Sequence, residues 1–108
     1  MTVYLIAEIK VTDNAWLPGY AETVHDIVHE HGGRYLTRSG AVRTLEGKAS
    51  GSDVIALIEF PSEEDVRAFV NDPKYRPFAE ARRSGSESRL ELIDRSDVAG
   101  TIEYLAKS

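Results

Sequence analysis

The chain has 108 residues, 42% of them hydrophobic and 29% charged, which is the size and balance of one globular domain. It carries 13 Lys and Arg against 18 Asp and Glu, and this formal net charge of −5 argues against a nucleic-acid partner, because such proteins carry a basic excess. It has no cysteine, which excludes a disulfide scaffold, a thiolate metal site and a cysteine nucleophile.

The chain begins with a predicted strand that is followed by a helix. Residues 3–11 are rich in β-branched and aromatic residues, and every second residue from Val3 is apolar, which is the pattern of a half-buried strand. Asp13 and its neighbours supply capping oxygens for a helix start. Helical apolar spacing then continues from Tyr20 until the glycines at 32–33 end it.

The middle of the chain predicts two strands with a loop between them. Residues 34–38 form the second strand, which we expect to continue through 42–45 after a bulge at 39–40. Residues 47–52 are a loop by composition. Residues 53–60 are the clearest strand, with apolar residues on both faces.

The last third predicts a helix, a helix restart and a fourth strand. Ser62 is the expected N-cap of the first helix, and Asp72-Pro73 restarts the helix with Pro73 at its first position. In the restarted helix Arg82 shares a face with apolar residues, and we expect it to form a surface ion pair. Residues 88–94 form the fourth strand, and 97–108 are an extended tail.

The predicted order is therefore βαββαβ, and it places both helices on the same face of one antiparallel sheet, because crossovers are right-handed. The opposite face has no cover, yet it carries apolar side chains, among them Tyr4, Ile6, Ile55 and Leu57. Exposing several of them to water forfeits a few kcal/mol. We therefore expect a homodimer in which two copies pack through their helix-free faces.

Several motifs occur in a fixed order along the chain: Gly32-Gly33-Arg34-Tyr35-Leu36 with Arg38 and Gly40, Leu45-Glu46-Gly47, Ile58-Glu59-Phe60-Pro61-Ser62, and Tyr75. In this order and spacing the chain resembles the domain of unknown function 1330 family, within the dimeric α+β barrel superfamily. The resemblance implies a ferredoxin-like α+β domain over residues 1–96, whose sheet pairs with that of a second copy, and an extended tail over 97–108. It implies no reaction, since the wider superfamily includes cofactor-free oxygenases, haem-degrading enzymes and small-molecule-binding modules.

Arg38 and Glu59 are the candidate catalytic residues. Strand alternation places Arg38 on the face of Leu36 and Glu59 on the face of Leu57, so both charges are expected to point into a cavity between the paired sheets. One interpretation is a structural ion pair that holds the dimer together. The other is an arginine that binds an anionic substrate group beside a glutamate that acts as a base.

Five further residues are candidates for substrate binding: Tyr35, Glu46, Tyr75, Trp16 and His29. The two tyrosines are expected at the core or at the cavity rim. Glu46 is either a turn residue or a side chain at the cavity mouth. Trp16, the single tryptophan, suits either a lid or a dimer contact.

His25 and His29 are spaced four apart on one helix face, which is the spacing that lets two imidazoles reach one metal ion. No third ligand follows at a supporting spacing, and a solvated polar helix face explains the pair equally well. We therefore expect no metal ion and no cofactor.

The function expected from these features is that of a small cofactor-independent enzyme that acts on a hydrophobic or aromatic molecule in the dimer cavity by acid–base chemistry. The alternative is a non-catalytic dimer that binds a small molecule or assists another protein. No apolar stretch approaches the roughly 18 residues that span a membrane, and no basic leader is present. We therefore expect a cytoplasmic protein without a membrane or nucleic-acid partner.

Overall fold

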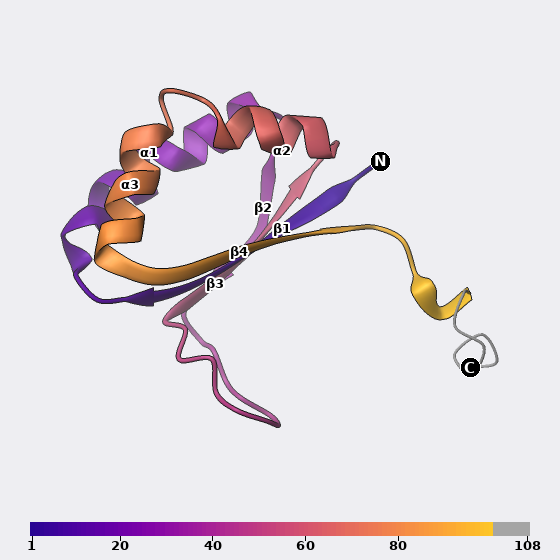
Figure 1. The fold of residues 1–108 in the computed structure, drawn as a ribbon, viewed down its shortest axis with the longest axis horizontal. Coiled ribbons are helices and arrows are strands. Elements are labelled where there is room, and N and C mark those ends of the chain that lie inside the picture. Colours follow the sequence, from indigo (N-terminus) through magenta and orange to yellow (C-terminus); the bar gives the residue numbers. More distant parts are fainter. Residues whose placement is uncertain (101–108) are drawn as a thin grey trace.

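Four antiparallel strands form one sheet in the computed structural model, which describes residues 1–100. The strands are β1 (Val3–Val11), β2 (Arg34–Ser39), β3 (Val54–Phe60) and β4 (Ser86–Asp94). The α-helices of the described residues are α1 (Leu17–Glu30), α2 (Glu63–Val70) and α3 (Arg76–Gly85). The order across the sheet is β2-β3-β1-β4, and the helices form a layer on one side of it (Figure 1). The predicted ferredoxin-like α+β fold is confirmed.

β1 lies between β3 and β4, and its alternating residues show the difference between the two faces of the sheet. Its odd-numbered residues from Val3 to Ile9 face the helices and are buried, whereas Tyr4, Ile6 and Glu8 lie on the helix-free face and are half-buried. This strand has the bounds expected from the sequence. We call the two sides of the sheet the helix-covered face and the helix-free face.

Local capping explains where the helices begin and end. The Asp13 side chain accepts a hydrogen bond from the Ala15 N–H at 2.9 Å and caps a 3₁₀ turn, Asn14–Trp16, which leads into α1. Gly32 follows α1 with a φ of +80°, a conformation that glycine adopts without strain. The expected N-cap Ser62 is confirmed, since its hydroxyl oxygen accepts from the Asp65 N–H.

Gly33 lets the chain pass closely over the core as it enters β2. A Cβ at this position would lie 2.6 Å from Val28 Cγ1 and 2.7 Å from Phe60 Cε1. Both neighbours are fully buried where α1 packs on β3, together with Val24. Only glycine fits between them, so this residue sets the distance between α1 and the sheet.

β2 differs from its prediction in a way that decides the site. The strand ends at Ser39, and residues 42–45 are not a strand, so the expected continuation after a bulge at 39–40 is wrong. The register shift lies instead between Tyr35 and Thr37, so Leu36 is the extra residue of the bulge. The residues on either side of Leu36 therefore no longer follow simple alternation.

The starts of α3 and β4 also differ from their predicted positions. The Asp72 carboxylate accepts from the Lys74 N–H at 2.8 Å, and the Asp72 carbonyl accepts from Tyr75 and Arg76. These bonds make residues 72–75 a turn, so α3 begins at Arg76 and not at Pro73. β4 begins at Ser86, two residues before its expected start, because Ser86 pairs with the end of β1 at Val11.

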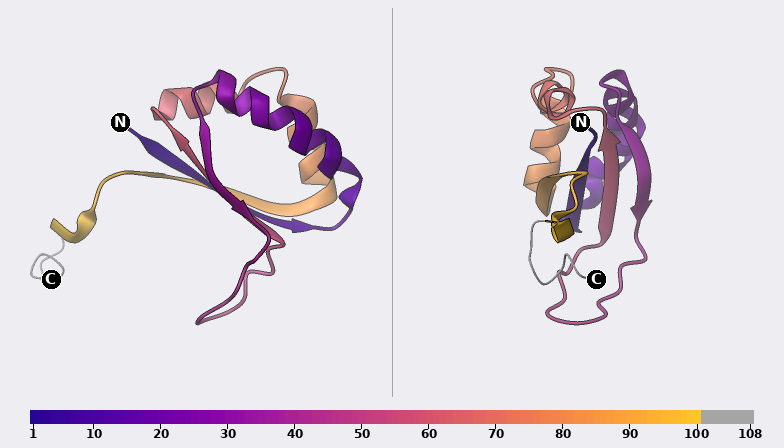
Figure 2. Two further views of the ribbon diagram at one scale, coloured as in Figure 1. Left: turned by 180° about the vertical axis from the view of Figure 1, so that it is seen from behind. Right: turned by 90° about the vertical axis from the view of Figure 1, so that its right-hand side faces the viewer.

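Residues 40–53 project from the sheet as a long loop between β2 and β3, away from the helix layer (Figure 2). After β4 the chain includes a 3₁₀ helix, Val98–Gly100, and the rest of the tail predicted to be extended, residues 101–108, lies outside the described residues. None of the helices within residues 1–100 has the length and hydropathy needed to cross a membrane.

Candidate functional site

A pocket of about 210 Å³ lies between α1 and the helix-covered face of the sheet. Its walls are apolar: Ala7, Ile9 and Val11 of β1, Val54, Ala56 and Ile58 of β3, and Leu17 and Ala21 of α1. Four larger side chains complete the lining, Trp16, Tyr20, Tyr35 and Arg38. An apolar cavity with a few polar groups is the usual form of a small-molecule site.

Arg38 is the one charged residue of this lining, and the bulge at Leu36 places it there. Tyr35 pairs with Ile58, and Arg38 pairs with Ala56, so both side chains reach the helix-covered face. In an unbroken strand the odd-numbered Tyr35 and the even-numbered Arg38 would lie on opposite faces. The extra residue therefore brings an aromatic ring and a cation together.

The Arg38 guanidinium is held by two aromatic rings. Its carbon lies 3.8 Å from the centroid of the Tyr35 ring, and its Nη2 donates to Nδ1 of His25 at 2.7 Å. The His25 ring stacks on Tyr35 with a centroid distance of 5.4 Å. A guanidinium only donates, so Nδ1 of His25 carries no proton, and the imidazole is neutral with its proton on Nε2.

Trp16 forms an end wall of the pocket and is fixed there by Gly85. The indole N–H donates to the Gly85 carbonyl at 3.0 Å, and a Cβ on Gly85 would lie 2.3 Å from Trp16 Cδ1. The indole also packs edge-on against Tyr20 with a centroid distance of 5.1 Å. Within one chain Trp16 is therefore a wall residue whose N–H is already used, and its two suggested roles, a lid or a dimer contact, stay predictions.

A buried hydroxyl cluster lies behind Tyr20. The Tyr20 and Tyr75 hydroxyls are 3.2 Å apart, and Arg82 Nη1 donates to Tyr75 at 2.7 Å and to Tyr20 at 3.4 Å. Arg82 Nε donates to the Ser88 hydroxyl at 3.2 Å. The expectation that Arg82 forms a surface ion pair is wrong, because the residue is 4% exposed and, within residues 1–100, no carboxylate pairs with it.

Burial keeps both tyrosines of the lining protonated. It raises the pKa of the Tyr20 hydroxyl far above its usual value, and the neighbouring Tyr75 raises it further. Burial also raises the pKa of Tyr35, although the Arg38 charge opposes this shift. At neutral pH both hydroxyls are therefore neutral hydrogen-bond donors.

Glu59 does not share a face with Arg38, so the expectation that both charges point into one cavity is wrong, and the two residues do not form the ion pair that one interpretation suggested. Glu59 lies on the helix-free face, where its carboxylate accepts from Arg34 Nη2 at 3.2 Å. The prediction assumed alternation through Leu36, and the bulge at that residue reverses the face on which Arg38 lies.

The remaining candidates are not brought together. Tyr75 is buried behind the pocket, and Glu46 lies on the exposed loop between β2 and β3, away from the pocket lining. His29 is exposed on α1, with its ring centroid 4.3 Å from that of His25. Within the described part of the chain, no three His, Cys, Asp or Glu residues cluster as metal ligands.

Three residues of the site were not predicted in the roles that the structure gives them: His25 as a partner of Arg38, and Tyr20 and Arg82 as members of one cluster. One signal was present, since Arg82 shares a helical face with Tyr75 and Ala79. A charged residue on an apolar face is a candidate for burial. The partner of that charge, however, comes from α1, about 60 residues away, as the separation of 62 between Tyr20 and Arg82 shows.

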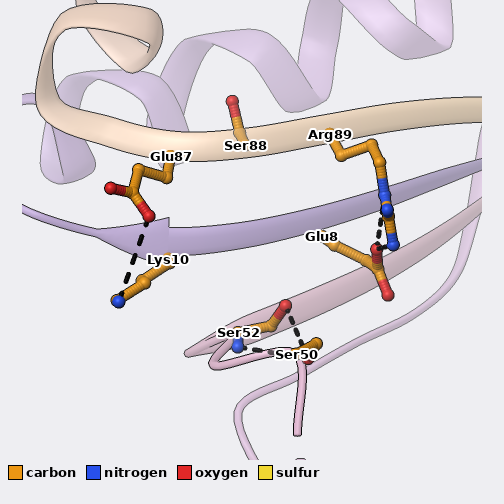
Figure 3. Close-up of a pocket in the computed structure, with 7 residues that line it drawn as sticks. All are labelled: Glu8, Lys10, Ser50, Ser52, Glu87, Ser88 and Arg89. Carbon is orange, nitrogen blue, oxygen red and sulfur yellow. Dashed lines mark hydrogen bonds and ion pairs between the residues drawn. The ribbon is translucent and has the colours of Figure 1, made fainter. Parts of the chain in front are cut away.

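A second, more open hollow of about 350 Å³ lies on the helix-free face, between β4, β1 and the loop before β3 (Figure 3). Its charged side chains pair with one another: Arg89 Nε donates to Glu8 at 2.9 Å, and Lys10 lies 4.0 Å from Glu87. Figure 3 shows Ser88 pointing away from these pairs, toward the helices. No charge is left unmatched there, so this hollow is a weaker candidate than the pocket.

Comparison with known proteins supports the fold. The model of the family described as domain of unknown function (DUF1330) matches residues 2–96. A protein of unknown function from Rhodopseudomonas palustris is 16% identical, with a TM-score of 0.77 and 89% of this chain and 83% of that chain covered. SnoaB, a cofactor-independent oxygenase from Streptomyces nogalater, is 14% identical, with a TM-score of 0.63 and coverage of 89% and 94%.

A dimeric ferredoxin-like protein of unknown function from Thermobifida fusca is 16% identical, with a TM-score of 0.55 and coverage of 87% and 91%. Among curated proteins, none is similar in sequence. At these identities the solved structures establish the fold alone.

Proposed function

The chain belongs to the DUF1330 family, and we propose that it is a small enzyme that binds a flat, largely apolar molecule with one anionic group and acts on it by acid–base chemistry. The observation that carries this proposal is the pocket between α1 and the sheet, where Arg38 is the one charge in an apolar lining. An arginine without a carboxylate partner, at an apolar cavity, is suited to hold an anion.

In this proposal His25 takes the role that the sequence suggested for Glu59. Nδ1 of His25 is an unprotonated nitrogen that accepts from Arg38. An anionic ligand group on Arg38 competes for the same N–H and thereby releases Nδ1. The released nitrogen can accept a proton from the ligand, which leaves an imidazolium and a ligand anion that Arg38 stabilises. SnoaB supports such chemistry, since its fold is similar and its activity is cofactor-independent.

The test measures binding of naphthalene-2-carboxylate and of its neutral analogue naphthalene-2-methanol by calorimetry. We expect the carboxylate to bind more tightly, and Arg38→Gln to weaken its binding about tenfold or more, because a charge-assisted bond is lost. Arg34→Gln is the matched control, since this arginine lies on the same strand but pairs with Glu59 on the other face. Equal losses in both variants, or no binding to the wild type, would contradict the proposal.

His25→Gln distinguishes an enzyme from a binding module. Glutamine can still accept from Arg38 but is not a base at neutral pH. An enzyme that uses His25 loses turnover in this variant and retains binding of the carboxylate. A variant that retains both turnover and binding would remove His25 from the mechanism, whereas a wild type that binds the carboxylate without any turnover would favour the binding module.

We also propose that the protein is a homodimer that pairs through its helix-free face. Tyr4, Ile6, Ile55 and Leu57 are only half-buried there, and no helix of residues 1–100 covers them. Similar structures from Jannaschia and Thermobifida fusca are described as dimeric. Light scattering is expected to report twice the mass of one chain, and a folded monomer at micromolar concentration would contradict this.

A further inference from the structure

In the hydroxyl cluster behind the pocket, the direction of each hydrogen bond follows from which groups can only donate. Arg82 only donates, and its Nη1 gives a hydrogen to the Tyr75 oxygen at 2.7 Å. Tyr75 is 2% exposed, and within residues 1–100 the partners of its hydroxyl are Arg82 and Tyr20. Its own proton therefore goes to the Tyr20 oxygen at 3.2 Å, since the alternative leaves a buried O–H without an acceptor.

The hydrogen bonds therefore run from Arg82 to Tyr75 and from Tyr75 to Tyr20, which is the last member of the series. Its oxygen accepts from Tyr75 and from Arg82, so its proton is the one that the cluster does not use. Tyr20 lines the pocket, whereas Tyr75 and Arg82 do not. Burial and the neighbouring hydroxyl hold this proton on Tyr20 at neutral pH.

Apart from Tyr20, the lining has three polar side chains, Trp16, Arg38 and Tyr35, and the Tyr35 hydroxyl is a second possible donor at the end of the pocket where Arg38 lies. The Trp16 N–H is used by the Gly85 carbonyl, and Arg38 is held by Tyr35 and His25 from β2 and α1. Arg82 contributes a buried positive charge without a carboxylate within the described chain, which strengthens Tyr20 as a donor through the shared hydrogen bonds.

We infer that Tyr20 donates a hydrogen bond to an acceptor oxygen of the ligand, so that the pocket recognises a flat apolar molecule with an anionic group at Arg38 and a second, neutral oxygen at Tyr20. The inference rests on the proposed binding role of the pocket and adds a specificity-determining residue to it. The ligand class is therefore an oxygenated aromatic or polycyclic acid, in which the two oxygen groups lie at separate positions of the ring system.

The test uses two probes of nearly equal shape, 6-hydroxynaphthalene-2-carboxylate and 6-methylnaphthalene-2-carboxylate. In the wild type we expect the hydroxy probe to bind more tightly than the methyl probe, because a hydroxyl in an apolar pocket is penalised unless it finds a partner. Tight binding of the methyl probe with weaker binding of the hydroxy probe would overturn the inference and leave the proposed function intact. No binding of either probe would contradict the proposed function itself.

Tyr20→Phe is expected to reverse this preference, with binding of the hydroxy probe about three- to tenfold weaker and binding of the methyl probe little changed. The ratio of the two affinities is the readout, because a general loss of stability lowers both equally. Tyr75→Phe is the matched control, since it removes a hydroxyl of the same cluster that does not line the pocket and should keep the preference. A preference that survives Tyr20→Phe would overturn the inference, and the comparison of the two probes in the wild type holds even where the variant does not fold.

Discussion

Arg34 and Arg38 lie on the same short strand, yet they have different surroundings. Arg34 pairs with the carboxylate of Glu59 on the helix-free face, whereas Arg38 contacts a neutral imidazole and an aromatic ring on the helix-covered face. The first charge is neutralised within the chain, and the second is not. One inserted residue, Leu36, therefore places two arginines of the same strand on opposite faces, one beside a carboxylate and the other at an apolar pocket.

The same contrast extends to the two faces of the sheet. The helix-free face combines half-buried apolar residues with matched pairs such as Arg89 with Glu8, which suits a second copy of the chain. The helix-covered face holds an apolar pocket that Arg38 lines, with Arg82 in the hydroxyl cluster behind it. Neither arginine has a carboxylate partner within the described residues. We therefore expect changes on the helix-free face to affect the dimer and leave ligand binding unchanged. Changes on the helix-covered face should affect the pocket and leave the dimer unchanged.

Leu57→Asp should break the helix-free face most severely. Leu57 pairs with Ile6 in the middle of that face, and an uncompensated carboxylate in a dimer interface costs about 2–5 kcal/mol. We expect a folded monomer by light scattering that still binds naphthalene-2-carboxylate. Leu92→Asp is the control, because Leu92 lies on β4 opposite Leu5 and faces the helix-covered side of the sheet. This change should leave the dimer intact. Loss of ligand binding together with the dimer would show that the two faces are not independent.

Gly85→Ala should break the pocket wall. The new methyl group would lie 2.3 Å from Trp16 Cδ1, so the indole must move, and such overpacking costs about 1–3 kcal/mol. The measurement is urea unfolding, together with a red shift of the emission of Trp16, the single tryptophan. Gly40→Ala is the control, because its Cβ would meet its nearest atom at 3.4 Å. An unshifted emission spectrum would show that the indole is not held as described.

Asp72→Asn should reduce stability in a pH-dependent way. Hydrogen bonds from His31 and from the Lys74 N–H hold the pKa of Asp72 below its ordinary value of 3.8. The native state therefore favours the carboxylate, and this stabilisation is present above pH 3.8 and is lost as the pH falls through the lower native pKa. The variant should unfold at lower urea than the wild type at pH 7, and the difference should narrow below pH 3.8. A constant difference across this range, or one matched by Asp26→Asn, would contradict the prediction.

Arg89→Gln should have the smallest effect. The pair of Arg89 with Glu8 lies on the surface of the single chain, and exposed pairs contribute about 0–1 kcal/mol. Urea unfolding of the variant should resemble that of the wild type, and ligand binding should be unchanged. A large loss of dimer affinity in this variant would show that the pair is buried against the second copy.

The sequence was sufficient to predict most of the fold because its signals are local. The alternation from Val3, the Ser62 cap and the glycines after α1 each depend on neighbours within a few residues. The helix restart at Asp72-Pro73 was misplaced for the opposite reason. The Asp72 side chain also contacts His31 at the end of α1, a partner 41 residues away that no local pattern reveals.

The candidate site was predicted less well than the fold. The catalytic role predicted for Arg38 stays a prediction. The residue lines a pocket, but alternation assigned it to the wrong face and to the wrong partner. A bulge of one residue changes the face without changing composition, so Leu36 looks like any other strand residue. Trp16 was predicted to bind substrate, as a lid or at a dimer contact, but its hydrogen bond to the Gly85 carbonyl could not be predicted from the sequence.

The sequence by itself determined the order of the elements, the common face of the helices and the apolar character of both sides of the sheet, because these follow from short-range periodicity and from the handedness of crossovers. The tertiary structure alone decided that Arg38 lies beside His25, and that Arg82, Tyr75 and Tyr20 form one cluster. Such contacts join α1, β2 and α3, and they depend on the register of the strands and the packing distance of the helices. These are properties of the whole assembly, which no short stretch of residues encodes.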